Sequence, residues 1–173
     1  MCIRDSLPMM PWASTIKELD ISSTTARIEL TAAVIKIISE EEEFEFIGPF
    51  VLPMSLGDVA NTITKVDLSS LGKMLTGDVS VFEQAINLQE FNVSGCVKIK
   101  GQLPGILITL ISEGKATFEG CEGPFTLSAS LGDVADSIIK VDLSSLGRTL
   151  TGDVSVFEQA RNLEEFNVTG CTE

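Results

Sequence analysis

The cysteines are the residues of this chain whose chemistry is easiest to test from spacing. Cys96, Cys121 and Cys171 recur at one position of an internal repeat, and the chain contains no histidine. Their spacing follows the repeat and not the C-x-x-C pattern of zinc ligands. Parallel side chains in register seldom reach the dihedral angle of a disulfide. We therefore expect buried free thiols that act as small hydrophobic groups, and neither a metal nor a cofactor.

No catalytic constellation is recognisable in the sequence. The lack of histidine excludes any histidine-dependent triad, and the glycines do not form a phosphate-binding loop. No serine lies in a G-x-S-x-G motif. The acidic run Ser39–Glu43 lacks the alternating ligand positions of a calcium loop, so we expect a solvated charged loop there. The chain is predicted not to be an enzyme.

An internal repeat in the sequence predicts the structural units that position these residues. Ser55–Cys96 and Ser130–Cys171 align without a gap at an offset of 75, and eight of the 42 positions differ. Such self-similarity indicates stacked units, each of which buries its apolar side against its neighbours. Glycines divide the repeat into successive units of 29, 24 and 22 residues, beginning at Gly48, Gly77, Gly101 and Gly123.

Each unit carries apolar residues in the pattern x-x-φ-x-φ-x-x-φ, which predicts a short strand followed by a turn. The run Val79–Leu88 has a period near three and predicts a 3₁₀ or irregular turn on the outer side. The side chains predicted to point inward are Val66, Leu68, Leu71, Phe91, Val93, Cys96, Ala116, Phe118, Cys121, Val141, Leu143, Phe166 and Val168.

The motif Leu88-x-x-Phe91-x-Val93-x-x-Cys96-x-x-Ile99-x-Gly101-x-Leu103-Pro104 resembles the plant-type leucine-rich repeat, LxxLxLxxNxLxGxIP, of receptor-like proteins. The resemblance implies an α/β solenoid, a horseshoe segment with a parallel concave β-sheet and an irregular or 3₁₀ convex side. Cysteine replaces the family's asparagine, whose amide bonds the backbone of adjoining coils. The alternative fold is a right-handed β-helix.

Domain boundaries follow from the same resemblance. Residues 7–173 are expected to form six to seven coils of the solenoid, as a fragment uncapped at its C-terminal end. Residues 1–6 are expected to be a non-native scar.

The outward strand positions form the concave face, which the family typically uses for partners. Opposite charges on adjoining coils are expected to pair, as in Lys65 with Glu90 and Glu90 with Lys115. Asn92 and Asn167 also begin N-glycosylation sequons. Either this face is a ligand groove, or its polar groups satisfy one another and the coils are mainly spacer. The ligand-binding candidates are Lys65, Asp67, Ser69, Glu90, Asn92, Ser94, Lys115, Thr117, Lys140, Asp142, Ser144, Glu165 and Asn167.

Composition restricts the partners. The 173 residues include 25 acidic and 12 basic side chains, a net charge of −13. This balance argues against nucleic acid and against an anionic membrane surface. No apolar run reaches the roughly 20 residues of a membrane helix. The expected partner is a protein, a peptide or another polar ligand.

The resemblance implies a binding scaffold, part of a receptor-like or secreted protein. The alternatives are an intracellular interaction scaffold, or the targeting arm of a larger enzyme such as a kinase. The sequons and the plant-type motif favour the cell surface or secretion. Cysteines without paired caps favour the reducing interior, so the compartment stays open with a slight preference for the outside.

Overall fold

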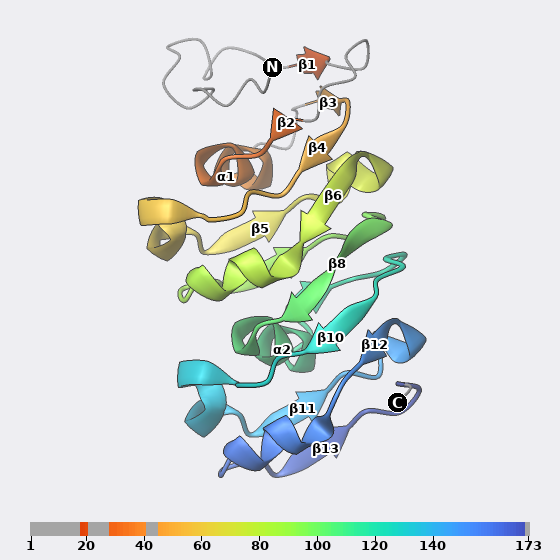
Figure 1. The fold of residues 1–173 in the computed structure, drawn as a ribbon. Coiled ribbons are helices and arrows are strands. Elements are labelled where there is room, and N and C mark those ends of the chain that lie inside the picture. The colour runs from red at the N-terminus through yellow and green to blue at the C-terminus, as the bar shows by residue number, and fades with distance from the viewer. Residues whose placement is uncertain (1–17, 21–27, 41–44, 172–173) are drawn as a thin grey trace.

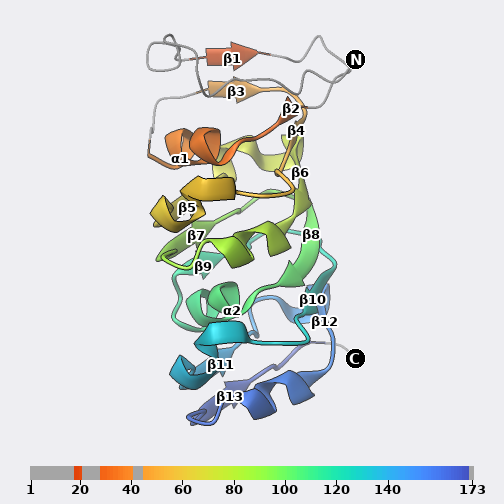
Figure 2. The same cartoon turned by 60° about the vertical axis from the view of Figure 1, so that its left-hand side comes forward.

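The computed structural model describes residues 18–20, 28–40 and 45–171. The scar expected at residues 1–6 lies outside these ranges. The described chain is an α/β protein that passes alternately through two sets of parallel strands, with helical segments between them. Within each set, the strands follow one another in chain order along the long direction of Figures 1 and 2. This order brings each unit into contact with the units next to it in the sequence.

The first set of strands lies where the sequence pattern predicts it. Neighbouring strands pair in parallel with equivalent repeat positions in register, so that Lys65 lies opposite Glu90 and Lys140 opposite Glu165. The strands are β1 (Glu18–Asp20), β3 (Glu45–Ile47), β5 (Lys65–Asp67), β7 (Glu90–Asn92), β9 (Ala116–Thr117), β11 (Lys140–Asp142) and β13 (Glu165–Asn167). They form three separate ladders among the described residues: β1-β3, β5-β7-β9 and β11-β13.

The second set forms one uninterrupted six-stranded sheet in the order β12-β10-β8-β6-β4-β2. Its strands are β2 (Ile28–Glu29), β4 (Phe50–Val51), β6 (Leu75–Asp78), β8 (Lys98–Leu103), β10 (Phe125–Leu127) and β12 (Leu150–Thr151). The expectation of an irregular or 3₁₀ side opposite the first strands is therefore wrong in part. Positive-φ glycines in β6 and β8, Gly77 and Gly101, interrupt the alternation of side chains by which a strand is recognised in sequence.

The helical segments also differ from expectation in two places. α1 (Ala32–Glu40) and α2 (Gly105–Ser112) are α-helices. α2 is short and apolar throughout, so it lacks the polar face by which a helix is recognised, and α1 spans only nine residues, too few for its buried Ala32, Ile35 and Ile38 to predict a helix from the sequence. Ser39 and Glu40, predicted to begin an acidic loop, end α1, and residues 41–43 lie outside the described ranges.

Elsewhere the outer turns are 3₁₀ segments, and the one predicted from the period of three is confirmed as η3. The 3₁₀ segments are η1 (Gly57–Thr62), η2 (Ser69–Met74), η3 (Val79–Gln84), η4 (Gly132–Ser137), η5 (Gly147–Thr149) and η6 (Val154–Gln159).

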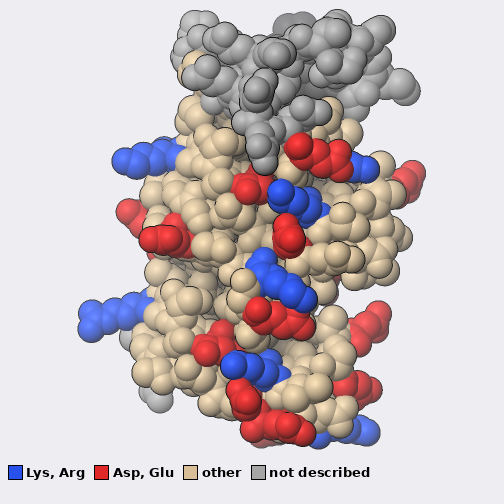
Figure 3. Space-filling model, turned by 180° about the vertical axis from the view of Figure 1, so that it is seen from behind, with Lys and Arg blue, Asp and Glu red and all other residues tan. Residues whose placement is uncertain are grey.

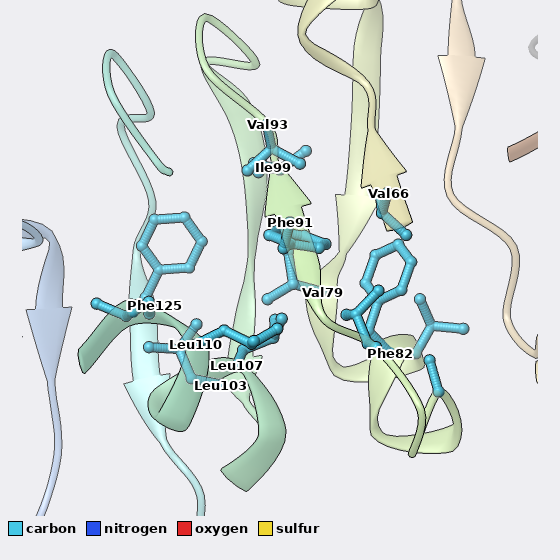
Figure 4. Packing of buried hydrophobic residues seen from close by; sticks show 14 of the residues in the cluster. Val66, Val79, Phe82, Phe91, Val93, Ile99, Leu103, Leu107, Leu110 and Phe125 are labelled. Atoms are coloured by element: carbon cyan, nitrogen blue, oxygen red, sulfur yellow. The ribbon is translucent and has the colours of Figure 1, made fainter. Parts of the chain in front are cut away.

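Buried side chains from both sets of strands and from α2 form one apolar cluster, part of which Figure 4 shows. Most residues predicted to point inward are buried, whereas Ala116, Phe118 and Val168 are partly exposed. Phe166 is the exception, because 45% of its surface is exposed whereas its repeat equivalent Phe91 is 1% exposed. No described strand covers Phe166 on the side where β9 covers Phe91.

Candidate functional site

The candidate site is the polar face, which we define as the thirteen predicted residues on β5, β7, β9, β11 and β13 or next to the ends of these strands. Lys65, Glu90, Lys115, Lys140 and Glu165 are exposed, and the Asp and Asn residues beside them are half-buried. In Figure 3, acidic and basic side chains alternate down the middle of the molecule. The face therefore presents neither a single sign of charge nor an aromatic anchor.

Asp67 is the centre of a hydrogen-bonded network across β5 and β7. Its Oδ1 accepts from the hydroxyl of Ser69 at 2.7 Å and from the Ser69 backbone N–H at 3.1 Å. Its Oδ2 accepts from the amide Nδ2 of Asn92 at 3.1 Å. The amide oxygen of Asn92 in turn accepts from the backbone N–H of Ser94 at 3.1 Å. Four predicted residues are thereby held in fixed positions.

The second copy repeats this network on β11 and β13. Asp142 Oδ1 accepts from the hydroxyl of Ser144 at 2.6 Å and from Asn167 Nδ2 at 3.2 Å. Asn167 Oδ1 accepts from the backbone N–H of Thr169 at 3.1 Å. An Asp on one strand and an Asn on the next thus form the recurring polar unit of this face.

These hydrogen bonds favour the charged form of both aspartates. Burial raises the pKa of Asp67, but the bonds from Ser69 and Asn92 and the charge of Lys65 outweigh it and leave the pKa below its ordinary value. Ser144, followed by Asn167 and Lys140, lowers the pKa of Asp142. Both networks are therefore most stable with ionised carboxylates.

Only part of the predicted charge pairing is found. Lys140 Nζ lies 3.1 Å from Glu165 Oε2, across β11 and β13. Lys65 and Glu90 lie opposite one another in register, but they make no ion pair within the part of the chain that is described. Lys115 pairs with Glu113 at 2.8 Å and not with Glu90, because Glu113 lies in the same turn after α2.

Two serines that were not among the predicted site residues join helices to this face. Ser39 Oγ, in the last turn of α1, accepts from the backbone N–H of Asp67 at 2.8 Å and donates to the Ile35 carbonyl. Ser112 Oγ, at the end of α2, accepts from the N–H of Asp142 at 2.9 Å and donates to Ile108. In the sequence, the tripeptide Ile-Ser-Glu at the end of each apolar run is the feature that could have pointed to these two serines.

These two contacts lie where the first set of strands is interrupted. β3 and β5 do not pair, nor do β9 and β11, and a helix end contacts β5 or β11 there. A serine hydroxyl takes the place of the strand carbonyl that would otherwise accept the aspartate N–H. The polar face is consequently divided between Thr117 and Asp142.

Cys96, Cys121 and Cys171 are free thiols, as predicted, and each bonds to the preceding unit, but Cys171 is only half-buried, whereas it was expected to be buried. Cys96 Sγ donates to the Leu68 carbonyl at 3.3 Å, and Cys121 Sγ donates to the Val93 carbonyl at 3.2 Å. Burial raises the pKa of Cys96 to about 12 and that of Cys121 to about 11. Such thiols remain protonated and serve as small donors within the core.

The sequon asparagines are not freely presented. Asn92 and Asn167 are half-buried, and the Nδ2 to which a glycan would be attached donates to Asp67 in one case and Asp142 in the other. Attachment at either site would require the Asp–Asn hydrogen bond to break. Their use in glycosylation stays a prediction.

Within the described ranges, no group of three or more Cys, Asp or Glu side chains is placed to hold a metal ion. None of the helices described is long and apolar enough to cross a membrane. The fold and site define an α/β protein built on parallel strands with a repeated polar face. Comparison with protein-family models, curated proteins and solved structures found no match to this chain.

Proposed function

We propose that this chain is a leucine-rich-repeat solenoid segment whose polar face binds a protein, a peptide or another polar ligand. The observation that carries the proposal is the register of the first strands, which aligns equivalent polar residues 25 positions apart, such as Asp67 with Asn92. Stacking in register is the arrangement that the leucine-rich-repeat resemblance implies. The chain then acts as a scaffold, within a receptor-like or secreted protein.

The fixed geometry of the face supports binding. The Asp–Asn networks hold their side chains before any ligand arrives, so less conformational entropy is lost on association. Lys65, Glu90 and Thr117 remain exposed beside these networks. A partner with alternating charges and hydrogen-bonding groups complements such a surface better than an apolar one.

A spacer role is the second candidate, and one observation favours it. The Asp67 and Asn92 side chains already bond to Ser69, to Ser94 and to one another. A ligand that displaces these bonds must replace them, and exposed ion pairs contribute only about 0–1 kcal/mol each.

Selection of binding peptides from a random displayed library separates the two roles. Selected peptides should lose at least roughly tenfold in affinity on Asn92→Phe, which fills the face and breaks the bond to Asp67. The matched control is Lys100→Glu, an exposed position on β8 in the other sheet. Failure to select any peptide, or equal binding to both variants, favours the spacer role.

A further inference from the structure

Asp67 and Asn92 keep hydrogen-bonding capacity beyond the bonds that they make to one another and to neighbouring serines. An ionised carboxylate accepts about four hydrogen bonds, and an amide NH₂ group donates two. Asp67 accepts twice from Ser69 at Oδ1 and once from Asn92 at Oδ2, and the second hydrogen of Asn92 Nδ2 has no acceptor among the described residues. An open acceptor position on Oδ2 and an open donor on Nδ2 therefore lie side by side, on atoms 3.1 Å apart.

Thr117 continues this row on β9. It lies opposite Asn92 in the parallel register, and its side chain is exposed. Its hydroxyl makes no hydrogen bond to another residue of the described chain, so it can both donate and accept. We call Asp67, Asn92 and Thr117 the central row. Because neighbouring strands lie about 4.8 Å apart, the row presents an acceptor, a donor and a hydroxyl at regular intervals.

The charges beside the central row nearly cancel. Lys65 and Lys115 are positive, Asp67 and Glu90 are negative, and Glu113, the ion-pair partner of Lys115, adds one negative charge. The whole chain, in contrast, carries a net charge of −13. The chain therefore repels a polyanion, the two lysines beside the row oppose a polycation, and a neutral ligand is complementary to this surface.

A ligand of the central row must present donors and acceptors at closely spaced positions. The ionised carboxylate of Asp67 only accepts, whereas the amide of Asn92 donates. Hydroxyl groups do both, so two hydroxyls on neighbouring carbon atoms can bond to the carboxylate and the amide together. Sugar rings carry such hydroxyls and repeat along a chain at an interval similar to the strand spacing. The thirteen residues of the polar face include none of the aromatic anchors on which tight peptide binding depends.

We propose that the central row binds a neutral oligosaccharide that lies across β5, β7 and β9. Neighbouring hydroxyls of one sugar unit donate to Asp67 Oδ2 and accept from Asn92 Nδ2, and a hydroxyl of the next unit bonds to Thr117. Lys65 and Glu90 lie on the same strands, exposed and without an ion pair among the described residues, and supply further hydrogen-bonding groups. This inference rests on the proposed function, since it names the ligand of the polar face.

A longer sugar chain can also contact the second copy. Asn167 Nδ2 donates to Asp142 Oδ1 at 3.2 Å, and Asp142 Oδ2 accepts no hydrogen bond from the described residues. β5, β7, β9, β11 and β13 follow one another along the long direction of Figure 2. A polysaccharide that spans both Asp–Asn pairs makes its second contact intramolecularly, so it should bind more tightly than a hexasaccharide.

Native electrophoresis in gels that contain a neutral polysaccharide tests the proposal. The probes are hydroxyethylcellulose, arabinoxylan, glucomannan and mixed-linkage β-glucan, and a bacterial host supplies the chain without a glycan on Asn92. At least one probe should retard the chain in a concentration-dependent manner. Cellohexaose or xylohexaose should compete with a dissociation constant on the order of millimolar, because exposed polar groups must first release water. Carboxymethylcellulose, the anionic counterpart of hydroxyethylcellulose, should retard the chain less.

Substitutions of similar size locate the site. Thr117→Val removes one hydroxyl and should weaken binding by at least about threefold, whereas Thr117→Ser should bind as the wild type does. Asn92→Ala removes the amide donor and should weaken binding by at least about tenfold. The matched control, Thr126→Val, makes the same change at an exposed position of β10 in the other sheet and should alter binding by less than about twofold.

Retardation by none of the probes overturns the proposal, and so does equal retardation of the wild type, Thr117→Val and Asn92→Ala. Stronger retardation by carboxymethylcellulose than by hydroxyethylcellulose also overturns it, because the lysines then recognise an anion. The selection of displayed peptides separates this inference from the proposed function. Peptides that bind the wild type and fail on Asn92→Phe, with no retardation by any polysaccharide, would support a peptide-binding face and overturn only the carbohydrate assignment.

Discussion

The hydroxyl of Ser112 accepts a hydrogen bond from the backbone N–H of Asp142 at 2.9 Å, and Ser39 and Asp67 make the same contact at 2.8 Å. Each serine lies in the last turn of an α-helix and each aspartate lies at the end of a strand of the polar face. The contact therefore joins the helices to the Asp–Asn networks at both interruptions of the first set of strands.

Removal of this hydroxyl should destabilise the protein. Ser112→Ala leaves the Asp142 N–H without its acceptor, and such a loss costs roughly 1–3 kcal/mol of unfolding free energy. Urea denaturation measures the change. The exposed Ser145→Ala is the control and should alter the free energy by less than about 0.5 kcal/mol. Equal stability of the two variants would show that water replaces the serine.

Truncation of a core residue should show whether neighbouring units depend on one another. Leu143 is completely buried, so Leu143→Ala should cost about 2–5 kcal/mol because the cavity cannot collapse between packed units. Ile139→Ala, at a 56% exposed position, is the control. An unchanged urea midpoint for Leu143→Ala would contradict the stacked-repeat interpretation.

A side chain at Gly101 should destabilise the protein. Its φ is +116°, and an added Cβ would collide with the carboxylate of Asp78 in β6, which can move aside only by giving up its hydrogen bond from the Ser80 N–H. We expect Gly101→Ala to cost about 2–3 kcal/mol. Gly57→Ala also has positive φ but meets nothing within 4 Å, so its cost should be about 1 kcal/mol. Adding Asp78→Ala to the Gly101 variant should restore part of the loss; no restoration would mean that backbone strain alone is responsible.

Acid should weaken the Asp67 network. The pKa of Asp67 is lower in the folded protein than its ordinary value, so ionisation adds stability above the unfolded pKa, and this stability is lost as pH falls through the folded pKa. Asp67→Asn should therefore lose less stability than the wild type between about pH 5 and pH 2, measured by urea midpoints. Ser69→Ala, which removes a donor to the carboxylate, should reduce the acid sensitivity in part. Parallel pH profiles for wild type and Asp67→Asn would rule out the network as the cause.

The buried thiols should resist modification in the native state. Cys96 and Cys121 have pKa values raised to about 12 and about 11, so almost no thiolate is present near neutral pH. Iodoacetamide should label Cys171 well before either of them, and addition of urea should equalise the rates. Rapid native labelling of Cys96 would contradict its placement in the core.

The first strands and their register could be predicted because duplication places equivalent residues at equivalent positions. The pattern around Val66 and Phe91 gave both the inward side chains and the polar face. The second sheet could not be predicted, because strands such as β12 are only two residues long and because Gly77 and Gly101 interrupt the alternation in β6 and β8.

Within the candidate site, residue positions were predictable but partners were not. Lys115 was expected to meet Glu90 and instead pairs with Glu113, since the turn after α2 brings Glu113 closer. The roles of Ser39 and Ser112 depend on two short helices, of which α2 is apolar throughout and has no polar face to mark it in the sequence. Phe166 was expected in the core but is 45% exposed, because no described strand covers it on the side where β9 covers Phe91.

The unequal continuity of the two sheets has a mechanical consequence. The second sheet runs through six strands without a break, whereas the first is interrupted at two seams, each bridged by a serine–aspartate hydrogen bond. Under tension along the long direction, the continuous sheet should resist extension. The two interruptions of the first set of strands should separate first. The protein should then bend by opening between Thr117 and Asp142 while the opposite side keeps its length.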